Sequence, residues 1–227
     1  MRYHKLHSWK VSTKDASRIQ CELKKRVCLK RRFGAIRCVA GADVGYLKGK
    51  AVGAVVVLEF PGLETLEKKF FVSEVAFPYI PGLLSFREAP ALLGALALVE
   101  CEPDVILFDG QGIAHPRRMG IATHLGLLLE KPTIGCAKSL LIGEYLPPRE
   151  GEGSYTLLKD KGEVIGAAVR TKKKRKPVFV SPGDGIDLMT SIQIVLECTG
   201  QHRLPEPLRE AHLLTNEIKG GLKDRVE

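Results

Sequence analysis

The segment DVILFDGQGIAHPRRMGIATHLGLLLEKPTIGCA (residues 104–137) decides the fold class. Two short apolar runs, at 104–109 and 132–137, flank a glycine-rich loop and the longer apolar stretch 119–130. A strand, a helix and a second strand in this order predict a crossover that joins two parallel strands. The first of these strands ends on Asp109, so a carboxylate stands where the buried run meets the loop.

Three more strands are predicted ahead of this unit. The runs 35–46, 51–60 and 64–77 are rich in apolar residues, and only the turn compositions LKGK and PGL separate them. Links as short as these join antiparallel neighbours. The stretch SFREAPALLGALALVE (85–100) predicts the helix that leads into the fourth strand.

The remaining elements complete a mixed sheet with helices on its faces. They are a capped helix within 12–27, a hairpin of 154–160 and 163–170, a strand over 177–183, and helices near 186–198 and 206–219. The predicted fold is α/β, with three antiparallel strands continuing into parallel strands, in a single domain over residues 1–227. This order is similar to the ribonuclease H-like architecture, which does not by itself give a function.

Composition favours a polyanionic partner. The chain of 227 residues has 35 Lys plus Arg against 26 Asp plus Glu, a net charge of +9 that suits nucleic acid. The densest basic runs are residues 24–32 and TKKKRK at 171–176. Either run could contact phosphates, and a solvated surface without a partner is the alternative for both.

Cysteine spacing and hydropathy exclude two classes of protein. The six cysteines form no CxxC pair and no zinc-finger pattern, so we predict no zinc site. The sequence has neither a signal peptide nor a run of about 18 apolar residues. We therefore expect a cytoplasmic protein with reduced thiols and no membrane partner, and a monomer because no assembly segment stands out.

Two carboxylates interrupt the predicted core. Asp43 lies within the small, apolar run CVAGADVGY, and Asp109 ends the fourth strand. If the first and fourth strands are neighbours, the two carboxylates repel each other unless a divalent cation lies between them, and oxygen ligands suit Mg²⁺ or Mn²⁺. The alternative for Asp43 is an edge position that faces water.

Glu88 is the third candidate acid. It stands near the start of the predicted helix 85–100, where it could offer its carboxylate to a metal or to a metal-bound water. The pattern SFRE also fits a capping box, with Ser85 as the N-cap and Glu88 bonded back to its backbone N–H. The two roles compete for the same oxygens.

Four blocks of sequence resemble the endonuclease V family: VAGADVGY (39–46), FPYIPGLLSFREAP (77–90), DGQGIAHPRRMGIATHLG (109–126) and PTIGCAKSLLIG (132–143). The resemblance implies a Mg²⁺-dependent endonuclease of DNA repair, with Mn²⁺ as a substitute cation. Such an enzyme flips deoxyinosine, the product of adenine deamination, into a pocket. It hydrolyses the second phosphodiester bond 3′ to the lesion and leaves 3′-OH and 5′-phosphate ends.

The same resemblance assigns the catalytic roles. Asp43 and Asp109 match the family's metal ligands, and Glu88 matches its third acid. Lys138 matches a lysine beside the scissile phosphate. His212, in EPLREAHLLT, matches a late catalytic histidine, and a place on the core face of the last helix is its alternative.

The resemblance also implies a base wedge and a base pocket. Two prolines restrict the backbone of PYIP, so that Tyr79 could replace base stacking, unless this rigid turn packs Tyr79 into the core. Glycines let backbone N–H and C=O groups approach the base, unless they only shape a tight loop. The wedge and pocket candidates are Pro78, Tyr79, Ile80, Pro81, Gly82, Leu84, Gly110, Gly112, His115, Gly120 and Leu141. We expect His124 to pack or to hydrogen-bond within its helix.

Two other functions remain open on the sequence. An inosine-specific endoribonuclease would read the same base in RNA, because only the sugar differs. A module that binds lesions without cutting belongs to another class of protein, and three acids in apolar surroundings count against it.

Overall fold

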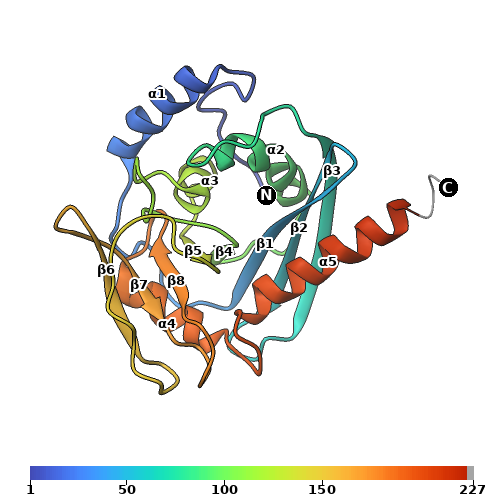
Figure 1. Cartoon of the computed structure of the whole chain (residues 1–227). Coiled ribbons are helices and arrows are strands. Elements are labelled where there is room, and N and C mark those ends of the chain that lie inside the picture. Colours follow the sequence, from blue (N-terminus) through green and yellow to red (C-terminus); the bar gives the residue numbers. More distant parts are fainter. Residues whose placement is uncertain (224–227) are drawn as a thin grey trace.

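An eight-stranded mixed sheet forms the centre of the molecule (Figure 1). The computed structural model describes residues 1–223 of the chain. The strands lie side by side in the order β3-β2-β1-β4-β5-β8-β7-β6. Their bounds are β1 Cys38–Leu47, β2 Lys50–Glu59, β3 Thr65–Glu74, β4 Val105–Phe108, β5 Thr133–Ala137, β6 Tyr155–Asp160, β7 Glu163–Val169 and β8 Val178–Pro182.

The predicted pairing of the first and fourth strands is confirmed. β1 pairs antiparallel with β2 and parallel with β4, and β4 pairs parallel with β5. The third strand ends at Glu74 rather than at residue 77, because Phe77 turns away from the sheet into a buried cluster. The fourth strand ends at Phe108, which makes Asp109 the first residue of the following loop.

Helices cover both faces of the sheet (Figure 1). α2 and α3 pack on one face, and α4 and α5 pack on the other. α1 lies outside the α2–α3 layer, and the side chain of Ser12 caps it by accepting the backbone N–H of Asp15, as predicted. The helix bounds are α1 Thr13–Leu23, α2 Leu84–Ala97, α3 Ile121–Leu129, α4 Leu188–Glu197 and α5 Glu206–Lys223, with a 3₁₀ turn at Lys24–Arg26.

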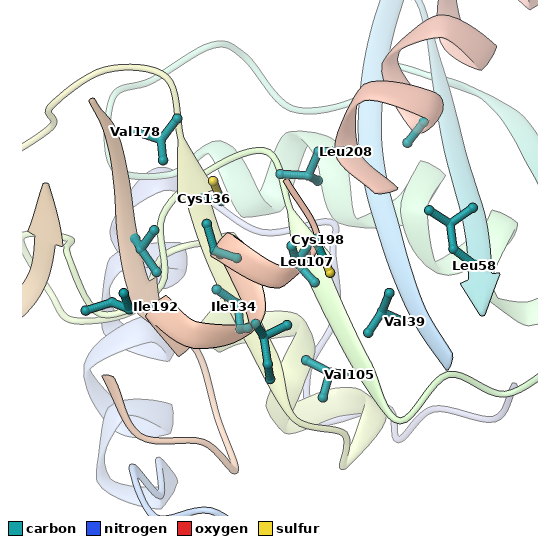
Figure 2. Packing of buried hydrophobic residues seen from close by; sticks show 14 of the residues in the cluster. Val39, Leu58, Val105, Leu107, Ile134, Cys136, Val178, Ile192, Cys198 and Leu208 are labelled. Carbon is teal, nitrogen blue, oxygen red and sulfur yellow. The ribbon is translucent and has the colours of Figure 1, made fainter. Parts of the chain in front are cut away.

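Alternation along each strand divides the core between the two faces. Val39 packs with Leu208 in the cluster under α4 and α5, which Figure 2 shows, whereas Ala40 belongs to the cluster under α2 and α3. Residues two apart share a face, so Asp43 points to the same side as Val39. The sheet therefore sends Asp43 toward α5.

The first turn of α5 rests directly on the backbone of β1. A Cβ atom added to Gly41 would lie 2.0 Å from the carbonyl oxygen of Pro207 and 2.6 Å from the backbone nitrogen of Leu208. No side chain fits in that gap. Gly41 thus sets how closely α5 approaches the sheet, and with it the position of every side chain on that helix.

None of the helices in residues 1–223 is long and apolar enough to cross a membrane. All six cysteines are free thiols.

Replacing Gly41 with Ala is expected to destabilise the fold by about 1–3 kcal/mol, because the added methyl group overpacks the β1–α5 contact. The measurement is the free energy of unfolding from urea denaturation. Gly34→Ala is the matched control, since no atom lies within 4 Å of its added Cβ and its backbone is not left-handed. Equal stability of the two variants would contradict this account of Gly41.

Candidate active site

Two carboxylates meet at the carboxyl ends of β1 and β4. Asp43 is 9% exposed and lies in a strand with neighbours on both sides, so the alternative of a water-facing edge position is wrong. The backbone N–H of Asp109 donates to the carbonyl oxygen of Ala42 at 3.1 Å. This bond fastens Asp109 beside the strand that carries Asp43.

Glu88 approaches the same place from α2. The alternative of a capping box is wrong, because Leu83 is the N-cap residue and no side chain caps this helix. Ser85 instead hydrogen-bonds through Oγ to Nδ1 of His124 at 3.0 Å. The Glu88 carboxylate accepts the Tyr46 hydroxyl at 3.1 Å, so it is buried but free of any capping role.

Two basic side chains pair with the aspartates. Nδ1 of His212 lies 2.8 Å from Oδ2 of Asp43, and Nζ of Lys138 lies 2.5 Å from Oδ2 of Asp109. The His212 side chain is 45% exposed, so the alternative that it belongs to the core face of its helix is wrong. Four of the five predicted catalytic residues therefore form two contacting pairs at one edge of the sheet.

Burial and neighbouring charges raise the pKa of two of the three acids. Burial raises the pKa of Asp43 above its usual range, and the charge of Asp109 adds to this effect. Burial also raises the pKa of Glu88 to about 8, with the Tyr46 hydrogen bond opposing and the charges of Asp43 and Asp109 adding to the rise. A cation placed among these carboxyl groups would favour their charged forms and so oppose both shifts.

The donor set fits a hard divalent cation. Carboxylate oxygens are the ligands of Mg²⁺, which usually keeps several of its waters and takes only one or two protein carboxylates. Within residues 1–223, no three His, Cys, Asp or Glu side chains are placed so that together they could hold a metal ion. A Mg²⁺ ion at this place would therefore take oxygens from one or two of the three acids and complete its coordination with water.

A pocket of about 320 Å³ opens beside the acids. Three segments build most of its wall: residues 79–85, 109–121 and 137–141. Asp109 and Lys138 both belong to that wall. The pocket and the carboxylate cluster are therefore adjoining parts of one site.

The predicted wedge stands at this pocket. The Tyr79 side chain is 70% exposed, so the alternative that it packs into the core is wrong. Tyr79, Ile80 and Pro81 line the pocket, whereas Pro78 lies outside its wall. Ile80 also packs against the cluster that contains Phe77, which anchors the turn while the tyrosine remains exposed.

Two of the predicted pocket glycines use their backbone groups internally. Gly112 lies outside the pocket wall; its N–H donates to Oγ of Ser181 at 2.8 Å, and its carbonyl accepts the N–H of Gly120 at 3.0 Å. An added Cβ on Gly112 would lie 2.1 Å from the carbonyl oxygen of Pro182. The prediction that Gly112 reads a base is wrong, and the tight-loop alternative holds for it. Gly120 lines the pocket, but its carbonyl accepts the N–H of His124.

Other backbone groups remain available at the pocket. The N–H of Gly110 has no hydrogen-bond partner within residues 1–223, and Ile121 begins α3, where helical N–H groups lack internal acceptors. Sequence reasoning missed Ile121 and Gln111, although both line the pocket. The start of a predicted helix next to the loop was the signal that could have found Ile121.

The two predicted leucines line the pocket. Leu84 and Leu141 both line the pocket, as does Gly82, whose φ is +80°. His124 packs, as expected: it is fully buried, with its ring among aromatic side chains. The ring makes its hydrogen bonds outside its own helix. In addition to its bond with Ser85, it contacts Nε2 of His7 at 2.7 Å, which joins α3 to α2 and to the N-terminal segment.

The His115 ring links two walls of the pocket in one protonation state. Its Nδ1 accepts the backbone N–H groups of Arg117 (3.1 Å) and Met119 (3.3 Å), so the ring proton sits on Nε2. Nε2 donates that proton to the carbonyl oxygen of Gly82 at 2.9 Å. Burial lowers the pKa of His115 to about 4; the charges of Arg117 and Arg118 add to the effect, and the bond to Gly82 opposes it.

The comparison with known proteins agrees with this geometry. The sequence model of the endonuclease V family matches residues 21–213. The chain is 51% identical over 215 residues to the endonuclease V of Methanothrix thermoacetophila, covering 95% of this chain and 96% of the relative. It is 48% identical over 211 residues to that of Dictyoglomus turgidum, covering 91% and 92%. The chain belongs to the endonuclease V family. It is therefore an endonuclease.

Solved endonuclease V structures share the fold. The Bacillus subtilis enzyme superposes with a TM-score of 0.95 at 35% identity, over 99% of this chain and 100% of that one. A Ciona intestinalis endonuclease V superposes with a TM-score of 0.81 at 29% identity, over 92% and 98%. That protein was crystallised with DNA containing an inosine followed by a ribo-adenosine. The ribonuclease H-like arrangement predicted from the order of strands is the fold of this family.

The neutral state of His115 predicts loss of stability in acid. Its folded pKa of about 4 lies below the ordinary 6.5, so between these values the unfolded chain binds a proton that the folded chain does not. The stability that depends on this group is complete above pH 6.5 and declines as the pH falls toward 4. The loss at pH 5 is about 2 kcal/mol, since one pKa unit corresponds to about 1.4 kcal/mol. Burial of His124, whose pKa falls to about 3, acts in the same direction.

Nitrogen NMR of histidine-labelled protein separates the contribution of His115 from that of His124. The His115 ring is expected to keep its proton on Nε2 and to remain neutral at pH 5. A ring that becomes charged with a midpoint near 6.5 would contradict both the tautomer and its part in holding the pocket.

Proposed function

We propose that this endonuclease repairs deaminated DNA: it takes a flipped deoxyinosine into the pocket and hydrolyses the second phosphodiester bond 3′ to it, leaving 3′-OH and 5′-phosphate ends. The observation that carries the proposal is the shared wall, in which Asp109 and Lys138 border both the pocket and the carboxylate cluster. A base held in the pocket places its own strand beside the acids. The inosine-containing DNA bound by the Ciona intestinalis relative supports this class of substrate.

The free backbone groups of the pocket suit hypoxanthine. Its six-position oxygen accepts hydrogen bonds, and the N–H groups of Gly110 and Ile121 are donors at the wall. Adenine carries an amine at that position, so a hydrogen-bond donor of the base would face the donors of the pocket wall. Each buried polar group left without a partner costs about 1–3 kcal/mol, so the pocket discriminates against the undamaged base.

The acids and their partners would carry the cutting chemistry. We assign Mg²⁺ to Asp43 and Asp109, with Glu88 reaching it directly or through water; when bound, the ion supplies positive charge and an acidified water. The Lys138 ammonium, 40% exposed beside Asp109, can stabilise negative charge on a phosphate that enters the site. His212 holds the Asp43 carboxylate in one orientation through its 2.8 Å contact.

Incubation with Mg²⁺ and a duplex carrying one deoxyinosine is expected to give a single nick one nucleotide beyond the lesion on its 3′ side. Asp43→Asn and Asp109→Asn should each lower the rate at least about 100-fold, since loss of partners that only support a metal ligand already costs 10–100-fold. The measurement is gel analysis of an end-labelled strand, with a chelator as the negative control.

Glu64→Gln is the matched control, because this exposed acid lies in the turn between β2 and β3, beyond the opposite end of the sheet. It should cut as fast as the natural sequence. An intact deoxyinosine strand at every enzyme concentration would refute the proposal. Faster cutting of a matched RNA strand would assign the site to inosine in RNA instead, and chelator-resistant binding without a nick would make the protein a lesion-binding module.

Tyr79→Ala should lower kcat/KM on a deoxyinosine duplex about tenfold or more, because stacking of a base on an aromatic ring contributes about 1–3 kcal/mol. The loss should be smaller on a single strand, where the base has no partner from which it must be separated. Tyr3→Ala, which removes another exposed tyrosine, is the control and should leave both rates unchanged. Equal losses on both substrates would argue against a wedge.

A further inference from the structure

A strongly basic loop projects beside the candidate active site. We define the basic loop as residues 171–177, which connect β7 to β8 and contain five consecutive cations at 172–176. Lys172 pairs with Glu152 at 3.2 Å. The next four side chains are exposed, and none of them forms an ion pair within the described part of the chain, residues 1–223. The loop therefore offers uncompensated positive charge to solvent.

Arg203 joins both ends of the basic loop to Lys138, which follows the carboxyl end of β5. Oγ1 of Thr171 donates to the carbonyl oxygen of Arg203 at 2.6 Å. Nη2 of Arg203 then donates at 2.8 Å to the carbonyl oxygen of Pro177 and, also at 2.8 Å, to that of Lys138. A single nitrogen atom thus joins the end of the loop to the residue whose ammonium group contacts Asp109.

Strand pairing also places the basic loop near the carboxyl end of β5, independently of the Arg203 contacts. Val169 pairs with Val178 at the base of the loop, and the next residue of β8, Phe179, pairs with Ala137 at the carboxyl end of β5. The loop is also preshaped, because the Arg170 guanidinium donates to the carbonyl oxygens of Pro148, Arg149 and Arg175. Less conformational entropy is lost on binding when the backbone is already held.

The other basic cluster, residues 24–32, lies at the opposite end of β5. The backbone N–H of Cys28 donates to the Asp184 carboxylate at 2.8 Å, and that of Arg32 donates to the carbonyl oxygen of Gly185 at 3.0 Å. Asp184 is in turn bonded to Thr133, the first residue of β5. The full length of this strand separates cluster 24–32 from Lys138. The structure therefore distinguishes two basic runs that the sequence left equivalent.

We propose that the basic loop binds backbone phosphates of the substrate strand or duplex that flanks the lesion, outside the base pocket and the cut. Lysine ammonium groups attract phosphates as mobile point charges, so the contact is independent of base sequence and of which lesion is present. This inference rests on the proposed function for the identity of the substrate. The loop would contribute affinity for nucleic acid and would take no part in cleavage of the phosphodiester bond.

The test compares two triple variants that each remove three exposed lysine charges. One is Lys173→Ser, Lys174→Ser and Lys176→Ser in the basic loop; the other is Lys24→Ser, Lys25→Ser and Lys30→Ser in cluster 24–32. Both variants have the same net charge, so a difference in their binding of DNA must come from the position of the removed lysines. Fluorescence anisotropy measures Kd for an inosine-free duplex in chelator at salt concentrations from about 50 to 200 mM.

The loop variant is expected to reduce the slope of log K against log salt by about 2–3, since each phosphate contact on duplex DNA contributes about 0.9. The cluster variant should keep the slope of the natural sequence. On a deoxyinosine duplex, the loop variant should raise KM and leave kcat unchanged. Thermal unfolding midpoints equal to that of the natural sequence verify that both variants fold.

Equal slopes for the two variants would overturn the inference, and so would a lower kcat with unchanged Kd. The binding assay contains neither inosine nor metal, so its result does not depend on whether the protein cuts at deoxyinosine. Failure of the proposed function would leave the binding of nucleic acid by this loop as a separate result.

Discussion

The crowding of three carboxylates in one place, two of them buried, is the constraint around which the site is built. Asp43 and Glu88 are each 9% exposed; burial raises the pKa of both, and the charges of neighbouring acids add to the rise. Buried charges persist only where partners compensate them. Lys138 supplies a cation to Asp109, His212 contacts Asp43, and Tyr46 donates to Glu88. These partners come from β1, α5 and the segment after β5, so several elements must converge on one edge of the sheet.

The pocket proposed to hold the base depends on a second set of contacts, which fix the shape of loops and do not pair charges. Gly112 is fastened to Ser181 of β8 and to Gly120, so the loop after β4 keeps its shape without a ligand. His115 bonds this loop to Gly82 in the segment that carries the wedge. In the proposed function, a preformed pocket would discriminate between bases because its polar groups cannot turn to suit an incorrect one. The same rigidity makes the pocket sensitive to protonation of its buried histidine.

Affinity and chemistry occupy neighbouring but distinct parts of the molecule in this account. The carboxylate cluster and the pocket share Asp109 and Lys138, and Arg203 joins the basic loop to them at the backbone carbonyl of Lys138. Phosphate binding by mobile lysines falls with salt, whereas the contacts of a buried site are screened much less. This division would let the enzyme hold undamaged nucleic acid weakly while it cuts only where a base fits the pocket.

The sequence by itself determined the succession of strands and helices along the chain, the parallel crossover of residues 104–137 and the acids that interrupt the apolar runs. Local periodicity and turn composition carry that information, because both act between residues close in the chain. Four family blocks added the candidate residues, of which Pro78 and Gly112 proved to lie outside the pocket.

Only the tertiary structure decided which partner each of these residues has. Asp43 and His212 are 169 residues apart, and Gly112 meets Ser181 across 69. No local pattern encodes such contacts, since they arise when strands align and α5 settles against Gly41. The capping box of Ser85 and Glu88 is locally plausible, yet Tyr46 on β1 and His124 on α3 take both side chains. The sequence likewise shows the charge of the two basic runs but not their positions. The structure places them at opposite ends of β5.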